Sequence, residues 1–143
     1  LDKLKTQLST AVCLHSINTS GRFGLLVDAS QFAIGCCLIQ WDSSDNEVPI
    51  AFASCKLSST QSRWSTIERE AYAVIWSLQK FFHWLFLAHV TIFFDHNPLS
   101  FLTETTPKSA KLVRWSLALQ QFDYIFKHRA AGQNTVADFL SRL

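Results

Sequence analysis

Four carboxylates stand where the surrounding residues are apolar or where a regular element should end. They are Asp28, Glu70, Asp95 and Asp138, among eleven acidic residues in the chain. A carboxylate in such a place is costly unless its charge is compensated. Two carboxylates about 4 Å apart repel by roughly 4 kcal/mol at an effective dielectric constant near 20. If these acids cluster they need protons or divalent cations between them, and oxygen-only ligands favour Mg²⁺ or Mn²⁺.

Two of these acids belong to expected strands. Asp28 lies in the apolar run of residues 25–29, and Asp95 closes the run of residues 91–95. Residues 23–29, 33–40 and 49–56 have strand composition and are separated by polar turns, which predicts an antiparallel meander. Strands are also expected at 90–95 and 124–128, and helices at 109–122 and 135–143, with short helices from Pro98 and over the first dozen residues.

Glu70 belongs to an expected helix from Thr66 to Phe82. Ser65 and Glu68 match a capping box, in which each side chain accepts a hydrogen bond from a free backbone N–H at the helix start. Glu70 borders the apolar stripe expected to lie on the sheet, so its carboxylate should face the strand acids. Glu68 is about 200° away around the helix and should point elsewhere. The stripe consists of Ile67, Ala71, Val74, Leu78 and Phe81.

Five segments, in matching order, resemble the ribonuclease H domain of gypsy-class reverse transcriptases, the enzymes of LTR retrotransposons. They read LVDAS at 26–30, PIAFAS at 49–54, WSTIERE at 64–70, FDHNPL at 94–99 and GQNTVADFLSR at 132–142. The resemblance covers nearly the whole chain. Residues 1–5 also resemble the segment that joins the polymerase to this domain. We therefore expect a connecting segment with a short helix at 1–20 and a ribonuclease H domain at 21–143.

The resemblance implies an α/β ribonuclease H-like fold, with a five-stranded mixed sheet flanked by helices. It also implies that the four acids hold two divalent ions, Mg²⁺ or Mn²⁺. By analogy Asp28 would bridge both ions, Glu70 and Asp95 would hold one, and Asp138 the other. One ion would activate a water for attack on an RNA phosphate, and the other would stabilise the leaving 3′ oxygen. The substrate would be an RNA–DNA hybrid, with the 2′-hydroxyl identifying the strand to be cut.

Further residues are candidates for substrate contact or turnover. His128 precedes Asp138 by ten positions, where related retroviral domains place a histidine that assists turnover; a structural role stays open. For His96 the structural interpretation is preferred. The expected hybrid contacts are Lys56, Arg63, Trp64, Lys108, Lys111 and Arg114. A solvated helix face explains the last three equally well, and Trp64 could instead pack its helix on the sheet. Trp41, Trp76 and Trp84 are read as core or rim residues.

Composition limits the other possibilities. The chain is 48% hydrophobic and 17% charged, which fits one globular domain, and the absence of methionine suggests a piece of a longer polypeptide whose polymerase domains would be partners. The cysteines form no C-x-x-C motif, so thiols in a reducing compartment are expected: cytoplasm or virus-like particle, or nucleus for a host-captured copy. The apolar run 81–94 contains two histidines and is shorter than the about 20 residues of a membrane span, so no membrane role is expected. The oligomeric state stays open.

Three other classes of protein share part of this pattern with a nuclease. A host-captured copy could serve as a scaffold or binding module, but it would be expected to lose an acid, and all four are present. A retroviral-type aspartic protease needs a glycine two residues after the aspartate of its motif, where this chain has Ser30. An integrase or transposase core usually works with three acids, and the motifs at 49–54 and 134–142 disfavour it.

Overall fold

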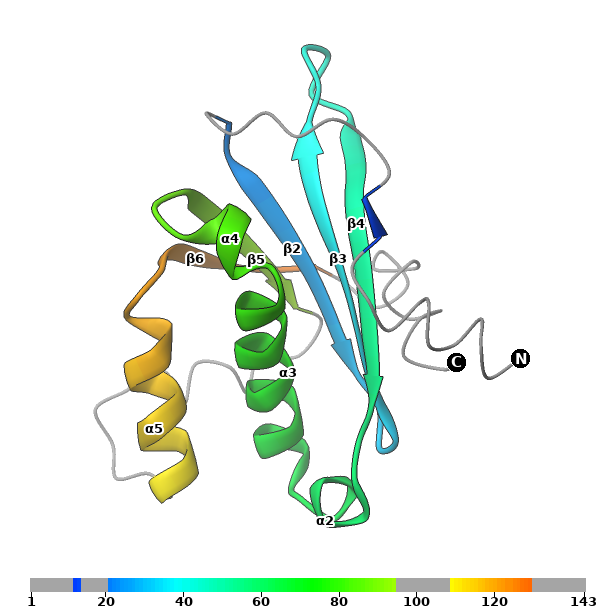
Figure 1. The fold of residues 1–143 in the computed structure, drawn as a ribbon, viewed down its shortest axis with the longest axis vertical. Helices are drawn as coiled ribbons and strands as arrows, with labels where there is room; N and C mark the ends of the chain where they lie inside the picture. The colour runs from blue at the N-terminus through cyan, green and yellow to red at the C-terminus, as the bar shows by residue number, and fades with distance from the viewer. Residues whose placement is uncertain (1–11, 14–20, 95–108, 130–143) are drawn as a thin grey trace.

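The computed structural model describes residues 12–13, 21–94 and 109–129. Within them the chain forms one mixed sheet with helices packed against it (Figure 1). The sheet order is β1-β4-β3-β2-β5-β6. The strands are β1 (Val12–Cys13), β2 (Phe23–Ala29), β3 (Ala33–Trp41), β4 (Glu47–Lys56), β5 (His89–Phe94) and β6 (Asp123–His128).

The predicted meander is confirmed, with β2, β3 and β4 pairing antiparallel in sequence order. The polar turn between β3 and β4 is built on Asp42, whose Oδ1 accepts hydrogen bonds from the backbone N–H groups of Ser44 and Asn46, both at 2.9 Å. The bond from Asn46 is the main reason that the pKa of Asp42 lies below its ordinary value. A carboxylate that accepts backbone bonds in this way stabilises a tight turn.

Strands β5 and β6 complete the sheet on the other side of β2. Strand β5 runs parallel to β2, and β6 runs parallel to β5. All five predicted strands are therefore present in a mixed sheet, which confirms the expected fold class. A sixth strand was not predicted: β1 pairs with β4 at the far edge, with Val12 opposite Phe52. Two residues of the expected connecting segment thus belong to the sheet.

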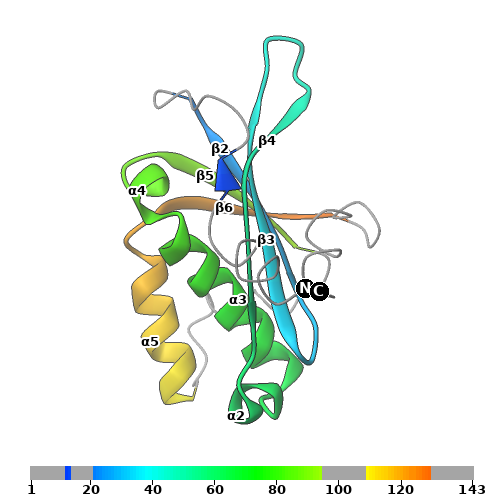
Figure 2. The same ribbon diagram turned by 45° about the vertical axis from the view of Figure 1, so that its right-hand side comes forward.

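The helices of the described residues are α2 (Ser59–Ser62), α3 (Thr66–Lys80), α4 (Phe82–Leu85) and α5 (Ala110–Leu119). The two longer helices, α3 and α5, lie side by side on one face of the sheet (Figures 1 and 2). The predicted helix 66–82 is divided near its end, because Phe81 leaves helical geometry as the C-cap of α3. The helix expected at 109–122 is confirmed over a shorter range, and α2 was not predicted.

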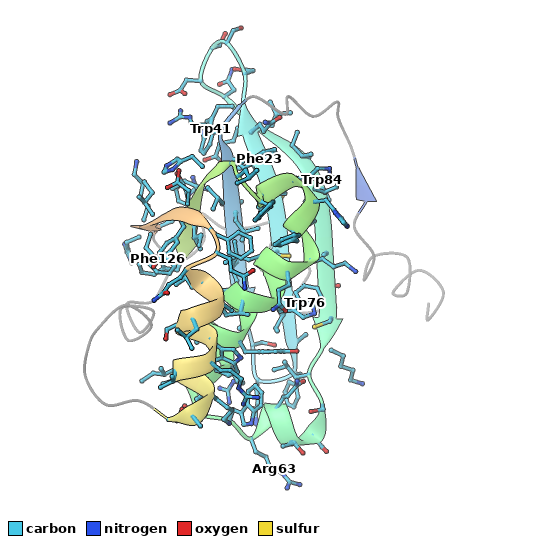
Figure 3. All side chains as sticks on the ribbon, turned by 60° about the vertical axis from the view of Figure 1, so that its left-hand side comes forward. Phe23, Trp41, Arg63, Trp76, Trp84 and Phe126 are labelled. Atoms are coloured by element: carbon cyan, nitrogen blue, oxygen red, sulfur yellow. The ribbon has the colours of Figure 1, made fainter. Side chains whose placement is uncertain are left out.

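Apolar side chains fill both faces of the central strand. Phe23, Leu25 and Val27 of β2 belong to the main core, together with buried residues of α3 such as Val74 and Leu78. Leu26 points to the other face, where it joins a smaller cluster with Cys37, Ile39 and Phe93. Three partly buried tryptophans pack at the margins of these clusters, as expected (Figure 3). They are Trp41, Trp76 and Trp84.

Apart from Val12, which belongs to β1, the helix expected over the first dozen residues lies outside the described residues, as do the helices expected from Pro98 and over 135–143. No helix of the part that the structure describes is long and apolar enough to cross a membrane.

Candidate active site

Three parallel strands, β2, β5 and β6, have their carboxyl ends on the same side of the sheet, and this side is the edge meant below. Leu26 of β2 pairs with Phe93 of β5, and Phe94 pairs with His128, the last residue of β6. Asp28, the penultimate residue of β2, is partly buried at this edge. In open α/β sheets, ligands bind beyond the carboxyl ends of strands, where connections leave to opposite sides. The boundary between β2 and β5 has this position, since the chain continues from β2 to β3 on one side and from β5 to β6 on the other.

Two of the four predicted acids, Asp95 and Asp138, lie outside the described residues, as do His96 and Lys108. In the sequence Asp95 directly follows Phe94, the last residue of β5. Asp28 and Asp95 each come two positions after a member of the Leu26–Phe93 pair. The described part of the candidate site is therefore formed by Asp28 and Glu70.

Glu70 extends from α3, the helix that packs on β2 (Figure 2). Its side chain is partly buried, and the Oε2 atom has less than 1 Å² of accessible surface. The neighbouring Ala71 and Val74 are fully buried, as predicted for the sheet-facing stripe. Keeping a carboxylate oxygen out of contact with water is costly unless another group compensates its charge. An all-oxygen donor set of this kind suits Mg²⁺ or Mn²⁺.

Glu68 has a different environment, two positions before Glu70. Its backbone N–H donates to the Ser65 hydroxyl at 3.2 Å, and its carboxylate accepts in return from the Ser65 N–H, which confirms the capping box. Its Oε2 also lies 2.8 Å from Nζ of Lys111 on α5. The hydrogen bond from Lys111 is the main reason that the pKa of Glu68 lies below its ordinary value. Lys111, an expected hybrid contact, therefore ties α5 to the first turn of α3.

An aromatic cluster reinforces this junction between the helices. The ring centroids of Trp64, Tyr72 and Trp115 are 5.4 to 5.8 Å apart. The Lys111 ammonium lies 4.1 Å from the Trp64 ring centroid, within cation–π range. Trp64 thus contacts both α3 and α5, and the sequence did not indicate that α5 would be its partner. Arg69 adds hydrogen bonds to the backbone carbonyls of Ser62 and Trp64.

The remaining expected contacts are solvent-exposed on separate elements. Arg63 is the C-cap of α2 (Figure 3). Lys56 ends β4, and Arg114 lies on α5. His128 is exposed at the end of β6, with its ring 6.0 Å from that of Phe94 in an edge-on arrangement. Within residues 21–94 and 109–129, no three His, Cys, Asp or Glu side chains are grouped as metal ligands. That part of the chain holds only two of the four predicted ligands.

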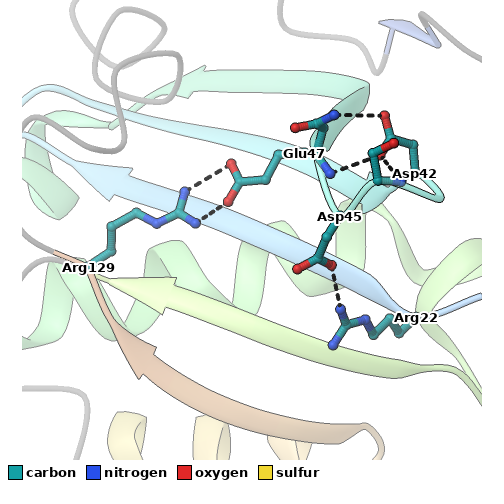
Figure 4. Close-up of polar contacts among 7 residues, drawn as sticks. Arg22, Asp42, Asp45, Glu47 and Arg129 are labelled. Carbon is teal, nitrogen blue, oxygen red and sulfur yellow. Dashed lines mark hydrogen bonds and ion pairs between the residues drawn. The ribbon is translucent and has the colours of Figure 1, made fainter.

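Two further residues near this edge were not singled out from the sequence. Arg129, directly after β6, forms a two-pronged ion pair with Glu47 at the start of β4, with one contact at 3.3 Å (Figure 4). Its guanidinium also lies 4.1 Å from the ring centroid of Phe93. The second residue is Phe32, whose exposed side chain lies in the turn between β2 and β3. The sequence could have drawn attention to Phe32, because it is an apolar residue in a polar turn. Nothing in the residues around Arg129 indicates its ion pair.

Comparison with known proteins places the chain in a family. Residues 18–122 match the model of the RNase H-like domain found in reverse transcriptase. The retrovirus-related Pol polyprotein from transposon opus of Drosophila melanogaster is 37% identical over 122 residues, or 85% of this chain. The Tf2-3 transposon polyprotein of Schizosaccharomyces pombe is 31% identical over the whole chain. The chain belongs to the family of RNase H-like domains of reverse transcriptases. It spans only 12% and 11% of these two relatives.

Solved structures agree on the fold. RNase H1 from the archaeon Halobacterium salinarum superposes with a TM-score of 0.62 and 20% identity, covering 85% of this chain and 96% of that one. The foamy viral protease-reverse transcriptase in complex with RNA/DNA hybrid superposes with a TM-score of 0.61 and 15% identity. That match covers 82% of this chain and 16% of the viral one. The chain therefore has the ribonuclease H-like fold that the sequence predicted.

Proposed function

We propose that this domain is a metal-dependent endonuclease that hydrolyses the RNA strand of RNA–DNA hybrids as part of a retroelement reverse transcriptase. The observation that carries the proposal is the pairing of Asp28, at the carboxyl end of β2, with a helix packed on that strand whose Glu70 carboxylate is partly buried. Membership of the family of RNase H-like domains found in reverse transcriptase supports the choice of an RNA–DNA hybrid as the substrate.

The acids would hold two divalent cations. Asp28 would supply oxygens to both ions and Glu70 to one, with Asp95 and Asp138 completing the set. Such ions, when bound, lower the pKa of a water and neutralise charge on the phosphate and the leaving oxygen. Asp28 and Glu70 stand on a strand and a helix that pack together, so the elements that carry these two acids are in place before substrate arrives. Preorganisation of this kind avoids reorganisation during the reaction.

The relatives support a proposal about the partners of the domain. Because these are Pol polyproteins of which the chain matches a small part, the partners would be the polymerase domains of the same polyprotein.

Cys36, Cys37 and Cys55 are free thiols, and burial raises the pKa of Cys36 and of Cys37 to about 12. Thiols this weakly ionised are poor nucleophiles. They agree with a structural role in a reducing compartment, the cytoplasm or a virus-like particle.

One assay tests the proposal. The 143-residue chain is incubated with an end-labelled RNA–DNA hybrid and Mg²⁺ or Mn²⁺, beside duplex DNA and duplex RNA. We expect cleavage of the RNA strand of the hybrid alone, with complete arrest by excess EDTA. Persistence of cleavage in EDTA would overturn the two-metal assignment. Tight binding of the hybrid without cleavage would instead support the scaffold function of a host-captured domain.

A further inference from the structure

Phe32 is an exposed aromatic residue at the edge that carries Asp28. Its side chain is 63% exposed, although the strands on either side of its turn are almost wholly buried. Isolated exposed hydrophobic residues are common on proteins and need no explanation. Phe32 differs from such residues in how firmly its backbone is held and in what lies beside it.

The turn presents Phe32 on a fixed backbone. Its N–H donates to the Ser30 hydroxyl at 3.2 Å, and its carbonyl accepts from the N–H of Leu57 at 2.7 Å. The Ser30 hydroxyl also accepts from the N–H of Ala33, and the Ser30 N–H donates to the Ala33 carbonyl at 2.9 Å. Both backbone polar groups of Phe32 are therefore bonded, so little backbone entropy remains to be lost when its ring is covered.

The position of Phe32 in the chain keeps it close to Asp28. It follows Asp28 by four residues, which at about 3.3 Å per residue span at most about 13 Å. That is the length of about four base-pair steps of a duplex. A cation lies on the adjoining strand, since the exposed Lys56 is paired with Ala33, the residue after Phe32. The turn thus offers one aromatic ring and one ammonium group within a few nucleotides of Asp28.

We infer that Phe32 and Lys56 form a contact for the RNA–DNA hybrid beside the cleavage position, an inference that rests on the proposed function. Bases inside a duplex are stacked, so the ring meets the sugar edges of the wide, shallow minor groove. The lysine meets a backbone phosphate, which fixes the register of the hybrid without reading its sequence. Phe32 supplies affinity and placement of the substrate, and the acids supply the chemistry.

The inference is tested by measuring hybrid affinity in a background that does not cut. In the Asp28→Asn protein, Phe32→Ala should weaken binding of a labelled hybrid about fivefold, the effect of losing about 40 Å² of apolar contact. Phe32→Trp should restore it. Lys56→Gln should make the slope of log affinity against log salt concentration shallower, by the amount that corresponds to about one phosphate contact. The matched control is Phe86→Ala, because Phe86 is also exposed but precedes β5 at the opposite edge of the sheet.

In the chain that retains Asp28, the same Phe32→Ala change should raise KM about fivefold and leave kcat within about twofold, because only ground-state binding is lost. Equal affinities of the Phe32→Ala and parent proteins would overturn the inference, as would equal losses in Phe32→Ala and Phe86→Ala. A parent chain that fails to cleave would instead overturn the proposed nuclease function. The two failures are distinguishable because binding in the Asp28→Asn background does not require cleavage.

Discussion

Arg129 and Glu47 form an ion pair across one face of the sheet although 82 positions separate them in the sequence. The Arg129 side chain is 16% exposed and that of Glu47 is 38% exposed. A second pair, Arg22 with Asp45, joins similar groups at 3.4 Å, but its side chains are 58% and 81% exposed (Figure 4). Both guanidinium groups also lie over an aromatic ring, Phe93 for Arg129 and Trp41 for Arg22.

The two pairs should differ in coupling energy, because a partly buried ion pair is screened less by water. Double-mutant cycles with Arg129→Gln and Glu47→Gln should give about 1 to 2 kcal/mol of coupling in urea unfolding. The Arg22–Asp45 cycle should give less than about 0.5 kcal/mol. Equal values for the two cycles would show that burial does not control the strength of either pair.

Asp28→Asn should reduce hybrid cleavage to background without loss of the fold. Removing one negative charge from a cluster of acids relieves repulsion in the metal-free protein, so the melting temperature should stay the same or rise. Cleavage by gel assay and thermal unfolding by circular dichroism measure the two effects. Cleavage near the parent rate in a folded Asp28→Asn protein would mean that the active site is elsewhere.

Glu70 and Glu68 should respond in opposite ways to the same amide substitution. Glu70→Gln removes a partly buried carboxylate beside β2 and should eliminate metal-dependent cleavage at little cost in stability. Glu68→Gln weakens the helix cap and the contact with Lys111, so it should cost on the order of 1 kcal/mol and keep most of the activity. Cleavage rates and urea unfolding of both proteins are compared. An inactive Glu68→Gln beside an active Glu70→Gln would reverse the assignment.

The Glu68–Lys111 contact should make stability depend on pH in the acid range. The folded-state pKa of Glu68 is lowered from 4.5, so its contribution is fully present above pH 4.5 and is lost as pH falls through the folded pKa. The difference in unfolding free energy between the parent and Glu68→Gln should therefore be largest near pH 6 to 7 and shrink toward pH 3. Urea titrations at several pH values measure it. A difference that grows on acidification would contradict the sign.

His128→Ala separates a turnover role from a structural one. Since His128 is exposed at the end of β6, its replacement should change the melting temperature little. If it assists turnover, kcat should fall several-fold while the melting-temperature shift produced by Mn²⁺ stays unchanged. A large loss of stability with normal kcat would identify the contact with Phe94 as the reason for the residue.

The parts of the fold that follow local rules could be read from the sequence. The capping box joins Ser65 to Glu68, three positions later, and it correctly predicts Thr66 as the first residue of α3. The strand bounds followed from apolar runs, and β2 has the predicted limits, Phe23–Ala29. The partners of charged groups could not be read in this way. Lys111 looked like a surface cation because its partner Glu68 is 43 positions away, and the distance between them depends on how α5 packs against α3.

Short elements and distant contacts could not be predicted, because both depend on residues that are far away in the sequence. A two-residue strand such as β1 has too few side chains to show alternation, and it is held by pairing with β4. The positions of the four acids in apolar runs or at element ends made them candidates, and the family resemblance assigned them to one metal site. Their spacing along the chain contains no information on whether they meet in space.

The parallel pairing of β2 with β5 sets an order of events during synthesis. Phe23 and Val90 are neighbours in the sheet, yet a ribosome adding about 5 to 20 residues per second reaches Val90 roughly 3 to 13 seconds after Phe23. The β2–β3–β4 meander needs only short turns and can close in that interval. On the nascent chain, the edge that carries Asp28 is therefore completed late, after most of the meander has already left the ribosome.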